Sequence, residues 1–152
     1  MPFLKTSILI GWNQSSIFHL EFIQNFTLLN LKFKWKEINL QRNDVIAKQL
    51  VSDIFLKRKK FNLILKGTDF ETLIWSKLTN LDVQKPIFYS ELSIEIFDNN
   101  KYSRAIGLAL SKNSIAYLIP CHLVCSKNNK KINYKWGPDL KRKLIDHDLN
   151  QK

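Results

Sequence analysis

Several features are scarce in this chain of 152 residues, and each scarcity argues against a class of protein. No run of apolar residues reaches the roughly 18 that a membrane-spanning helix needs. The apolar run at residues 7–12 is too short for a secretory signal, and no small-residue cleavage site follows it. Two cysteines, Cys121 and Cys125, are too few for a fold held together by disulfides. We therefore expect a cytoplasmic protein that binds no membrane and keeps its cysteines reduced.

Acidic residues are also scarce, with 13 Asp and Glu against 24 Lys and Arg, a formal net charge of +11 and a pI near 9.7. Such a balance favours polyanionic partners, because each neutralised phosphate releases counterions. A merely soluble basic protein is the alternative, and charge alone does not separate the two. The excess is +7 in residues 1–66 and +4 in residues 67–152. Its densest run, residues 57–60, is expected to be the solvated end of a helix.

Hydrophobic residues make up 45% of the chain, enough for a packed core in one domain or two small ones. The first 66 residues have the pattern of a small α/β domain with an antiparallel sheet. Residues 7–12 and 17–23 flank a polar turn, which predicts a β-hairpin. Further strands are expected within residues 31–35 and 61–65. Asp44 is placed to cap a helix whose apolar residues follow helical spacing: Val45, Ile46, Leu50, Ile54 and Phe55.

A domain boundary is expected at residues 66–67, so that residues 67–152 form a second domain. Thr68 and Glu71 have the spacing of a capping box, in which each side chain accepts the backbone N–H of the other residue. A helix follows, then a second one capped by Ser90 and a third at residues 103–110. The last two are separated by a short polar turn, which predicts a helix-turn-helix. Two core-packing helices with no role in DNA binding are the alternative.

The next segment carries the most informative residues. Residues 115–119 are apolar and are expected to form a short buried strand that Pro120 ends. Cys121 begins the turn and His122 follows it directly. A thiol beside an imidazole at such a turn is a place where a thiolate can be formed and directed. A buried structural cysteine is the common alternative, so the surrounding residues must decide.

Those surroundings form an ordered set. Residues 120–124 read Pro-Cys-His-Leu-Val, Asn113 lies eight positions upstream, and residues 103–107 read Ser-Arg-Ala-Ile-Gly. Residues 133–134 (Asn-Tyr) follow, and a helix that begins at residues 137–138 (Gly-Pro) carries a His-Asp pair near its end. In this order and spacing the chain resembles the O6-alkylguanine-DNA alkyltransferases, also called methylated-DNA–protein-cysteine methyltransferases.

The resemblance covers most of the chain, because residues 67–71 (Gly-Thr-Asp-Phe-Glu) with Trp75 also match the family, and the opening hairpin matches it loosely. It implies an α/β (α+β) fold, with a small ribonuclease-H-like domain at residues 1–66. It implies a helical DNA-binding domain with a helix-turn-helix at residues 67–152. The implied function is a stoichiometric DNA repair protein. It moves an alkyl group from O6-alkylguanine in double-stranded DNA to its own cysteine, as a monomer with no cofactor and no metal ion.

Four residues are expected to carry the chemistry. Removing an alkyl group from guanine O6 is a displacement at saturated carbon, for which a thiolate is the best protein nucleophile. His122 is expected to take the proton of Cys121 through a bridging water, and Asp148 to orient and stabilise the imidazole. Asn113 is expected to hold the turn through side-chain hydrogen bonds. This network predicts a thiol pKa below its ordinary value.

The target base must leave the duplex before a buried thiol can reach it. By resemblance, Arg104 fills the vacated stack, and Tyr89 presses on the phosphate and hydrogen-bonds the guanine. The alternatives are a surface arginine and a core ring. Four further groups are implied to line the base pocket: the backbone at Cys121 and Val124, and residues Tyr134 and Lys135.

The sequence departs from the family pattern at four positions. Leu123 stands where an arginine is usual, Asp148 where a glutamate is usual, Trp136 where a glycine is usual, and Ser114 where a proline is usual. These changes concern rate and substrate size more than the type of reaction. Cys125 is expected to be structural or a bystander. The alternative function is a DNA-lesion-binding or helix-turn-helix regulatory protein with little or no transfer activity.

Overall fold

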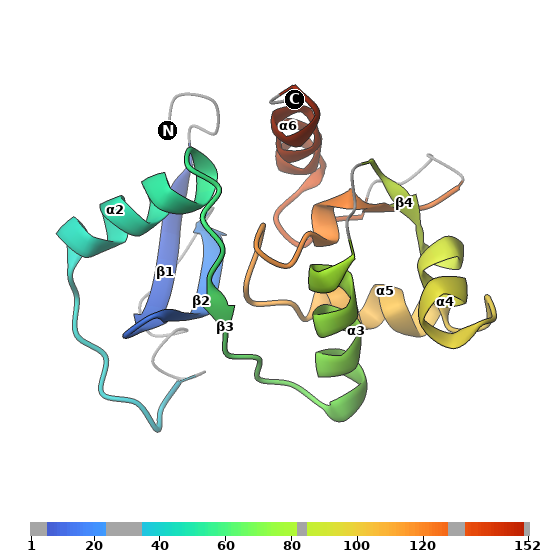
Figure 1. Cartoon of the computed structure of the whole chain (residues 1–152), viewed down its shortest axis with the longest axis horizontal. Helices are drawn as coiled ribbons and strands as arrows, with labels where there is room; N and C mark the ends of the chain where they lie inside the picture. The colour runs from blue at the N-terminus through green and yellow to red at the C-terminus, as the bar shows by residue number, and fades with distance from the viewer. Residues whose placement is uncertain (1–5, 24–34, 82–84, 128–132, 151–152) are drawn as a thin grey trace.

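The structure, a computed structural model, describes residues 6–23, 35–81, 85–127 and 133–150. Figure 1 shows a small sheet with a helix beside it on one side of the molecule, further helices on the other side, and the last helix of the chain between them. This is the mixed α/β class that the sequence predicts. The elements, in chain order, are β1 (Ser7–Asn13), β2 (Ser16–Ile23), α2 (Asp44–Phe55), β3 (Asn62–Leu63), α3 (Asp69–Asn80), β4 (Ile87–Phe88), α4 (Tyr89–Phe97), α5 (Ser103–Ser111), the 3-10 helix η1 (Cys121–Leu123), β5 (Val124–Cys125) and α6 (Pro138–Leu149).

The first sheet has the order β1-β2-β3 and is mixed, where the sequence predicts an antiparallel one. Strands β1 and β2 form the expected antiparallel hairpin, with an irregularity in register at Gly11. Strand β3 pairs with β2 in parallel. The direction follows from the connection, because a chain that crosses over through a helix returns parallel to the strand it left. Most of the strand expected within residues 31–35 lies outside the described residues, and Trp35 itself is in a turn.

Helix α2 begins one residue earlier than its predicted cap implies. Asn43, not Asp44, is the N-cap, and its side chain accepts the backbone N–H of Ile46 at 3.1 Å. Val45, in the first turn of the helix, is 80% exposed, whereas Phe55, in its last turn, is fully buried. The helix is therefore anchored by its last turn, and its apolar spacing overstates how much of it packs.

Helices α3 to α5 build the second half. The predicted capping box is confirmed: Thr68 N–H donates to the Glu71 carboxylate at 2.9 Å, and Glu71 N–H donates to the Thr68 hydroxyl at 3.3 Å. Trp75 Nε1 then donates to the carbonyl of Ala109 at 3.0 Å, which ties α3 to α5.

Helices α4 and α5 and the turn between them form the expected helix-turn-helix. The turn starts at Asp98, which adopts a left-handed backbone conformation with φ of 58°. Ser90 is not the cap of α4, because the helix begins at Tyr89. The N-cap residue is Phe88, and its backbone N–H donates to the Glu91 carboxylate at 2.9 Å.

One hydrophobic core draws side chains from both sides of residues 66–67, including Leu20 and Phe55 from the first half and Trp75 and Leu144 from the second. Backbone hydrogen bonds join the halves as well: Leu20 N–H donates to the carbonyl of Ser114, and the carbonyl of Leu20 accepts the N–H of Ala116, both at 2.8 Å. The division into two domains stays a prediction. No helix in the described part of the chain is both long and apolar enough to cross a membrane.

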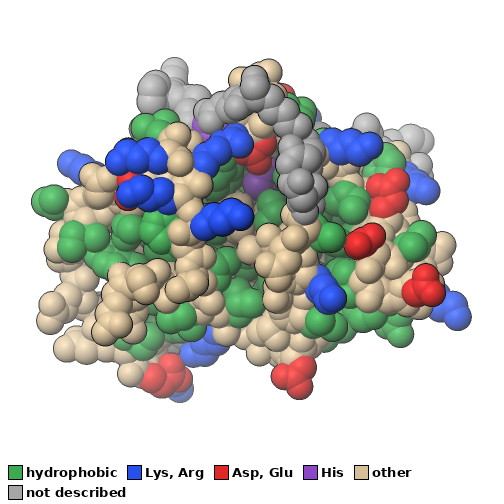
Figure 2. Space-filling model, viewed as in Figure 1, with side chains coloured by type: hydrophobic (Ala, Val, Ile, Leu, Met, Phe, Trp, Pro, Cys, Tyr) green, Lys and Arg blue, Asp and Glu red, His purple; other side chains and the backbone are tan. Residues whose placement is uncertain are grey.

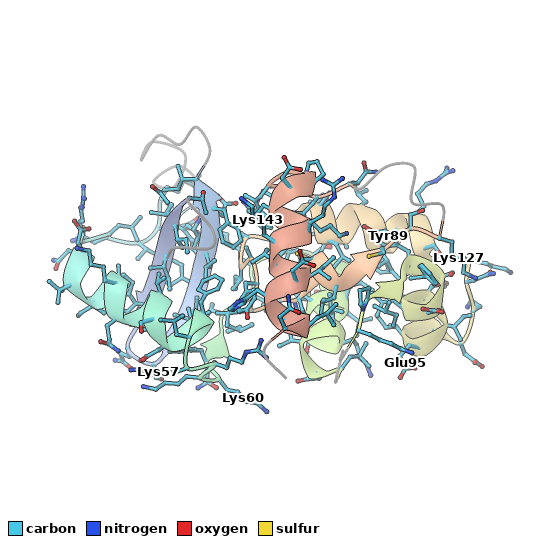
Figure 3. The ribbon with its side chains drawn as sticks, turned by 90° about the horizontal axis from the view of Figure 1, so that it is seen from above. Lys57, Lys60, Tyr89, Glu95, Lys127 and Lys143 are labelled. Carbon is cyan, nitrogen blue, oxygen red and sulfur yellow. The ribbon has the colours of Figure 1, made fainter. Side chains whose placement is uncertain are left out.

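Basic side chains gather on one part of the surface. Figure 2 shows them over α2 and the segment that follows it, and Figure 3 shows Lys57 and Lys60 extending from that segment on the side away from Tyr89. Residues 57–60 are exposed, as predicted for a solvated helix end. Two members of the run, Lys57 and Lys59, form ion pairs with Asp53 at 2.8 and 2.9 Å.

Candidate active site

The segment before the cysteine is a tight turn, not the predicted strand. It makes only isolated bridges, one of them between Leu20 and Ile115. Leu118 N–H donates back to the carbonyl of Ala116 at 2.8 Å, and Tyr117 at the corner has a φ of 68°. A bulky residue in this region is a true backbone outlier. The chain therefore reverses within residues 115–119, and this reversal brings Cys121 back beside Asn113.

Asn113 holds both ends of that turn. Its side-chain oxygen accepts the N–H of Ile115 at 2.7 Å. Its side-chain amide donates to the carbonyl of Ile115 at 3.3 Å and to the sulfur of Cys121 at 3.2 Å. The residue is fully buried. The predicted contact between Asn113 and the turn is therefore present, and it reaches the sulfur itself.

The Cys121 thiol is 5% exposed and opens η1. Burial raises its pKa, because a thiolate loses hydration inside the protein. The amide of Asn113, the ammonium of Lys141 and the hydroxyl of Tyr134 act in the opposite direction but do not outweigh burial. The expected lowering of the thiol pKa is therefore wrong, since it counted neighbouring groups and not the loss of water. At rest Cys121 is a protonated thiol.

His122, which is fully buried, pairs with the partly exposed Asp148. The Nε2 atom of His122 lies 2.8 Å from Oδ2 of Asp148, which reaches it from α6. Burial lowers the pKa of His122, and the carboxylate only partly offsets this. Burial alone would raise the pKa of Asp148, but hydrogen bonds from His122 and Tyr117 outweigh it and lower that pKa. The pair therefore rests as a neutral imidazole beside a carboxylate, which is the contact that the sequence predicts.

Lys141 is a functional candidate that sequence reasoning missed. It lies on α6 within a Lys-Arg-Lys run that is typical of a solvated face, yet it is only 3% exposed. Its ammonium donates to the carbonyl of Val124 at 2.6 Å. Burial lowers its pKa, while the nearby thiols of Cys125 and Cys121 act to raise it. A signal was available: Lys141 lies one residue after Leu140 and seven before Asp148, on the face that packs inward.

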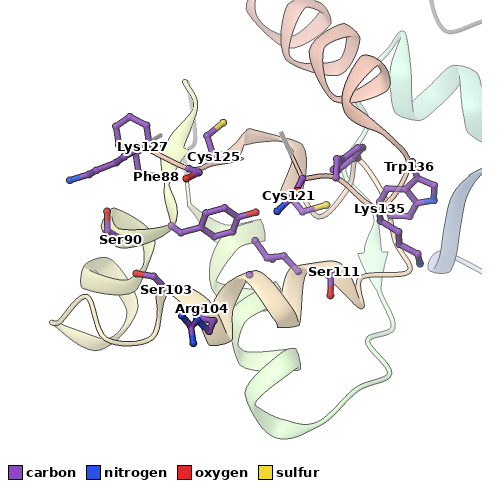
Figure 4. Close-up of a pocket in the computed structure, with 16 residues that line it drawn as sticks. Phe88, Ser90, Ser103, Arg104, Ser111, Cys121, Cys125, Lys127, Lys135 and Trp136 are labelled. Carbon is purple, nitrogen blue, oxygen red and sulfur yellow. The ribbon is translucent and has the colours of Figure 1, made fainter. Parts of the chain in front are cut away.

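A cavity of about 870 Å³ opens beside the cysteine. Figure 4 shows Cys121 on η1 and Arg104 on α5, both among the residues that line it. Strands β4 and β5 pair in parallel and bring the start of α4 next to the end of η1. The cavity contains the thiol and four of the predicted base-binding residues: Tyr89, Arg104, Tyr134 and Lys135.

The structure places the fifth predicted contact elsewhere. Val124 does not line the cavity; its side chain is fully buried and its carbonyl is held by Lys141. Lys135 lines the cavity, but its ammonium turns away to Glu21 and to the carbonyl of Asn113. Its backbone, rather than its charge, therefore remains for a base.

Trp136 forms one wall of the cavity. It is 5% exposed, and its ring meets Phe22 edge-on at 5.9 Å and Tyr134 at 5.2 Å.

In the described ranges, no three His, Cys, Asp or Glu side chains come together where they could hold a metal ion.

Comparison with known proteins agrees with this geometry. The family model described as 6-O-methylguanine DNA methyltransferase, DNA binding domain, matches residues 69–149. A methylated-DNA–protein-cysteine methyltransferase of Methanosarcina barkeri is 32% identical over 145 residues, which cover 94% of this chain and 90% of that protein. This chain is a member of the methylated-DNA–protein-cysteine methyltransferase family. A relative of the same name from Methanosarcina mazei is 30% identical, with the same coverage of both chains.

Solved structures confirm the fold of this methyltransferase family member. The O6-methylguanine methyltransferase of Mycobacterium tuberculosis has a TM-score of 0.75 at 23% identity, and the match covers 95% of this chain and 87% of that one. The O6-methylguanine-DNA methyltransferase of Pyrococcus kodakaraensis has a TM-score of 0.65 at 18% identity, over 94% of this chain and 98% of that one. The family and fold predicted from the sequence are therefore confirmed, while the role of each residue stays a prediction.

Proposed function

We propose that this chain repairs DNA by moving the alkyl group of O6-alkylguanine in a duplex to the sulfur of Cys121, once per molecule. The activity named for its relatives is methyl transfer from DNA to a protein cysteine. The observation that carries the assignment to Cys121 is its place in the structure. It is a thiol in the wall of a cavity, hydrogen-bonded by Asn113 and followed directly by a paired histidine.

The hydrogen bond between His122 and Asp148 fixes which ring nitrogen can act as a base. An ionised carboxylate only accepts hydrogen bonds, so Nε2 of His122 carries the proton and Nδ1 is left as the acceptor. Nδ1 is buried and has no hydrogen-bond partner in the described residues. It is therefore the atom that takes the thiol proton, and Asp148 then stabilises the imidazolium that forms.

The reaction needs no further reactant. The sulfur of Cys121 attacks the alkyl carbon as its proton passes to His122. The new S–C bond forms while the C–O6 bond breaks, and the bonding pair goes to the guanine. The guanine takes up a proton from water as it leaves, and the imidazolium of His122 returns its proton to water. In sum, one proton moves from thiol to guanine and one alkyl group moves from oxygen to sulfur. Because a thioether is not readily reversed, each molecule reacts once.

Burial of the thiol is consistent with a cysteine that stays unreactive until the substrate base enters the cavity. A protonated thiol that is 5% exposed is a poor target for solvent-borne reagents. Lys141 and Asn113 are already placed to favour the thiolate as it forms, so the charge appears among fixed partners. The cavity beside the sulfur provides the space that a flipped base requires.

DNA is expected to reach the cavity from the α4–α5 side. Arg104 is exposed on α5 and lines the cavity, which suits a residue that replaces the extruded base. Tyr89 lines the same cavity, and burial raises the pKa of its phenol, so it stays a hydrogen-bond donor at neutral pH. We propose that the protein acts as a monomer in the cytoplasm, where a reactive thiol is kept reduced.

Mass spectrometry tests the assignment. Incubation with a duplex that contains O6-methylguanine should add one methyl group to the intact protein, and peptide mapping should place it on Cys121. Cys125 lines the same cavity and provides the matched control: Cys125→Ser should retain transfer and Cys121→Ser should lose it. If the protein binds the lesion tightly but gains no mass, the lesion-binding alternative is established. If the methyl group is found on Cys125, the reacting thiol is Cys125 and not Cys121.

A further inference from the structure

The carboxylate of Asp148 is held by more than the histidine. Its Oδ2 atom faces His122, while its Oδ1 atom accepts the hydroxyl of Tyr117 at 2.8 Å. The guanidinium of Arg58, from the segment after α2, lies 3.4 Å from the same Oδ1. Each carboxylate oxygen therefore has its own partner, and neither is free to exchange places with the other.

Tyr117 reaches this position at the cost of an unusual backbone. Its φ of 68° is the left-handed region, which a bulky side chain rarely adopts. Its ring is stacked between Phe55, at 4.4 Å, and the imidazole of His122, at 5.4 Å with planes 12° apart. Outliers of this kind persist where the surroundings determine the conformation, and they cluster at functional sites.

We propose that Tyr117 is a positioning residue for alkyl transfer, an inference that rests on the proposed function. Its hydroxyl anchors Oδ1 of Asp148, so that Oδ2 stays on Nε2 of His122. Its ring lies against the imidazole and keeps the plane of the histidine fixed. The result is a histidine with one tautomer and one orientation, and Nδ1 is always the nitrogen that accepts the thiol proton.

The shorter carboxylate explains why a second anchor is needed. The Asp148 side chain is 21% exposed, so water competes for its oxygens. A carboxylate that turns about its last bond would break the contact with His122, because an aspartate has little length with which to compensate. A phenol that is itself stacked between two rings is a rigid donor and opposes that rotation. Arg58 adds a weaker hold, since it is half exposed and lies farther away.

Tyr117→Phe tests the hydroxyl and keeps the ring stack. We expect the single-turnover rate constant at saturating O6-methylguanine DNA to fall by about two- to tenfold, the equivalent of one hydrogen bond. The dissociation constant for the duplex should not change. In ¹⁵N NMR of the unreacted protein, the ring nitrogens of His122 should move from the signature of a pure Nε2–H tautomer toward a mixture, which a merely structural residue would not cause.

Two basic residues of the same exposed run supply a matched pair of controls. Arg58→Gln removes the guanidinium from Asp148, and Lys57→Gln removes an equal charge that pairs with Asp53 instead. Arg58→Gln should slow transfer by less than Tyr117→Phe does, and Lys57→Gln should leave the rate constant at the wild-type value. Equal losses in both would show that total charge, not contact with the carboxylate, matters.

The outcomes separate this proposal from the function on which it rests. If wild-type protein transfers the methyl group and Tyr117→Phe matches it in rate and in His122 shifts, the positioning role is overturned and the function stands. If Tyr117→Phe only lowers the melting temperature and leaves the His122 shifts unchanged, the residue is structural and the proposal is again overturned. If wild-type protein gains no methyl group, the function fails, and the NMR comparison still decides whether Tyr117 fixes the tautomer.

Discussion

The two halves of the molecule contribute to the site in different ways. The second half holds the thiol, its hydrogen-bond partners and, within the part of the chain that the structure describes, all the residues that line the cavity. The first half reaches the site through two charged side chains, because Glu21 binds Lys135 and Arg58 binds Asp148. It also reaches the site through two aromatic rings, Phe22 against Trp136 and Phe55 against Tyr117. All four act on residues that themselves hold or surround reacting groups. The difference teaches that the first half positions residues of the site, whereas the reacting groups belong to the second half.

The largest effect should come from the base. His122→Ala removes the proton acceptor, and we expect single-turnover transfer to fall by about a hundredfold or more, the usual contribution of general base catalysis. His147 is a second buried histidine near Tyr117, and it bonds to the carbonyl of Phe55. His147→Ala, measured below its melting temperature, should keep most of the rate. If both variants lost the same activity, the second half would act through its packing rather than through one imidazole.

A smaller loss is expected from Asp148→Asn, which removes the charge that stabilises the imidazolium and keeps the shape. Transfer should slow roughly tenfold, in the range of a hydrogen bond to a charged group, and less than in His122→Ala. The pKa of Asp148 is lowered in the folded protein, so its contribution to folding stability is fully present above the ordinary carboxyl range. That contribution to stability is lost as the pH falls through the lowered pKa. An unchanged rate at neutral pH would remove Asp148 from the site.

Arg104→Ala should affect one substrate and spare another. Extrusion from a duplex needs a side chain that fills the gap, and a free base needs none. We therefore expect transfer from O6-methylguanine DNA to fall several times more than transfer from a small benzylguanine. Single-turnover rates on the two substrates decide the question. Equal losses would indicate that Arg104 supports the fold of α5 instead.

The smallest effect on rate, with a clear effect on stability, should follow from Glu21→Gln in the first half. Burial alone would raise the pKa of Glu21, but the neighbouring imidazole of His19, 3.4 Å from the carboxylate, and the ammonium of Lys135 lower it to about 2. Because the carboxyl pKa is depressed in the folded protein, it stabilises the fold above pH 4.5 and loses that contribution as the pH falls toward 2, a total on the order of 3 kcal/mol. Glu21→Gln should therefore lower the melting temperature at neutral pH and flatten acid unfolding in that window.

Glu37 provides the matched control for the ion pair between Glu21 and Lys135. It also pairs with a lysine, Lys66 at 3.1 Å, but its side chain is 62% exposed, and such surface pairs contribute little. Glu37→Gln should leave the melting temperature and the acid transition as they are. A fall equal to that of Glu21→Gln would show that charge balance, rather than the contact across the two halves, sets the stability.

Local signals predicted the parts of the fold that local interactions decide. The capping box of Thr68 and Glu71 and the proline that starts α6 depend on neighbours in sequence, and both are found as expected. Long-range packing decides the rest. Val45 has helical spacing but nothing to pack against, and β3 is parallel because of the crossover before it. Neither property can be read from a short window of residues.

The site shows the same limit. The pairing of His122 with Asp148 follows from residue types and order, and the structure brings them to 2.8 Å. Lys141 and Tyr117 were missed because their neighbours in sequence suggest a solvated face and an ordinary buried strand. The thiol pKa was predicted in the wrong direction because burial is a property of the whole fold and not of the motif.

The aromatic contacts between the halves carry a consequence for any attempt to divide the protein. The family match begins at Asp69, which suggests a short autonomous unit. A fragment cut there would lose Phe55 from the ring of Tyr117 and Phe22 from the ring of Trp136. The two aromatic side chains on either side of the reactive cysteine would then face water. The fragment would keep every atom that reacts and would lack the surface on which those atoms are assembled.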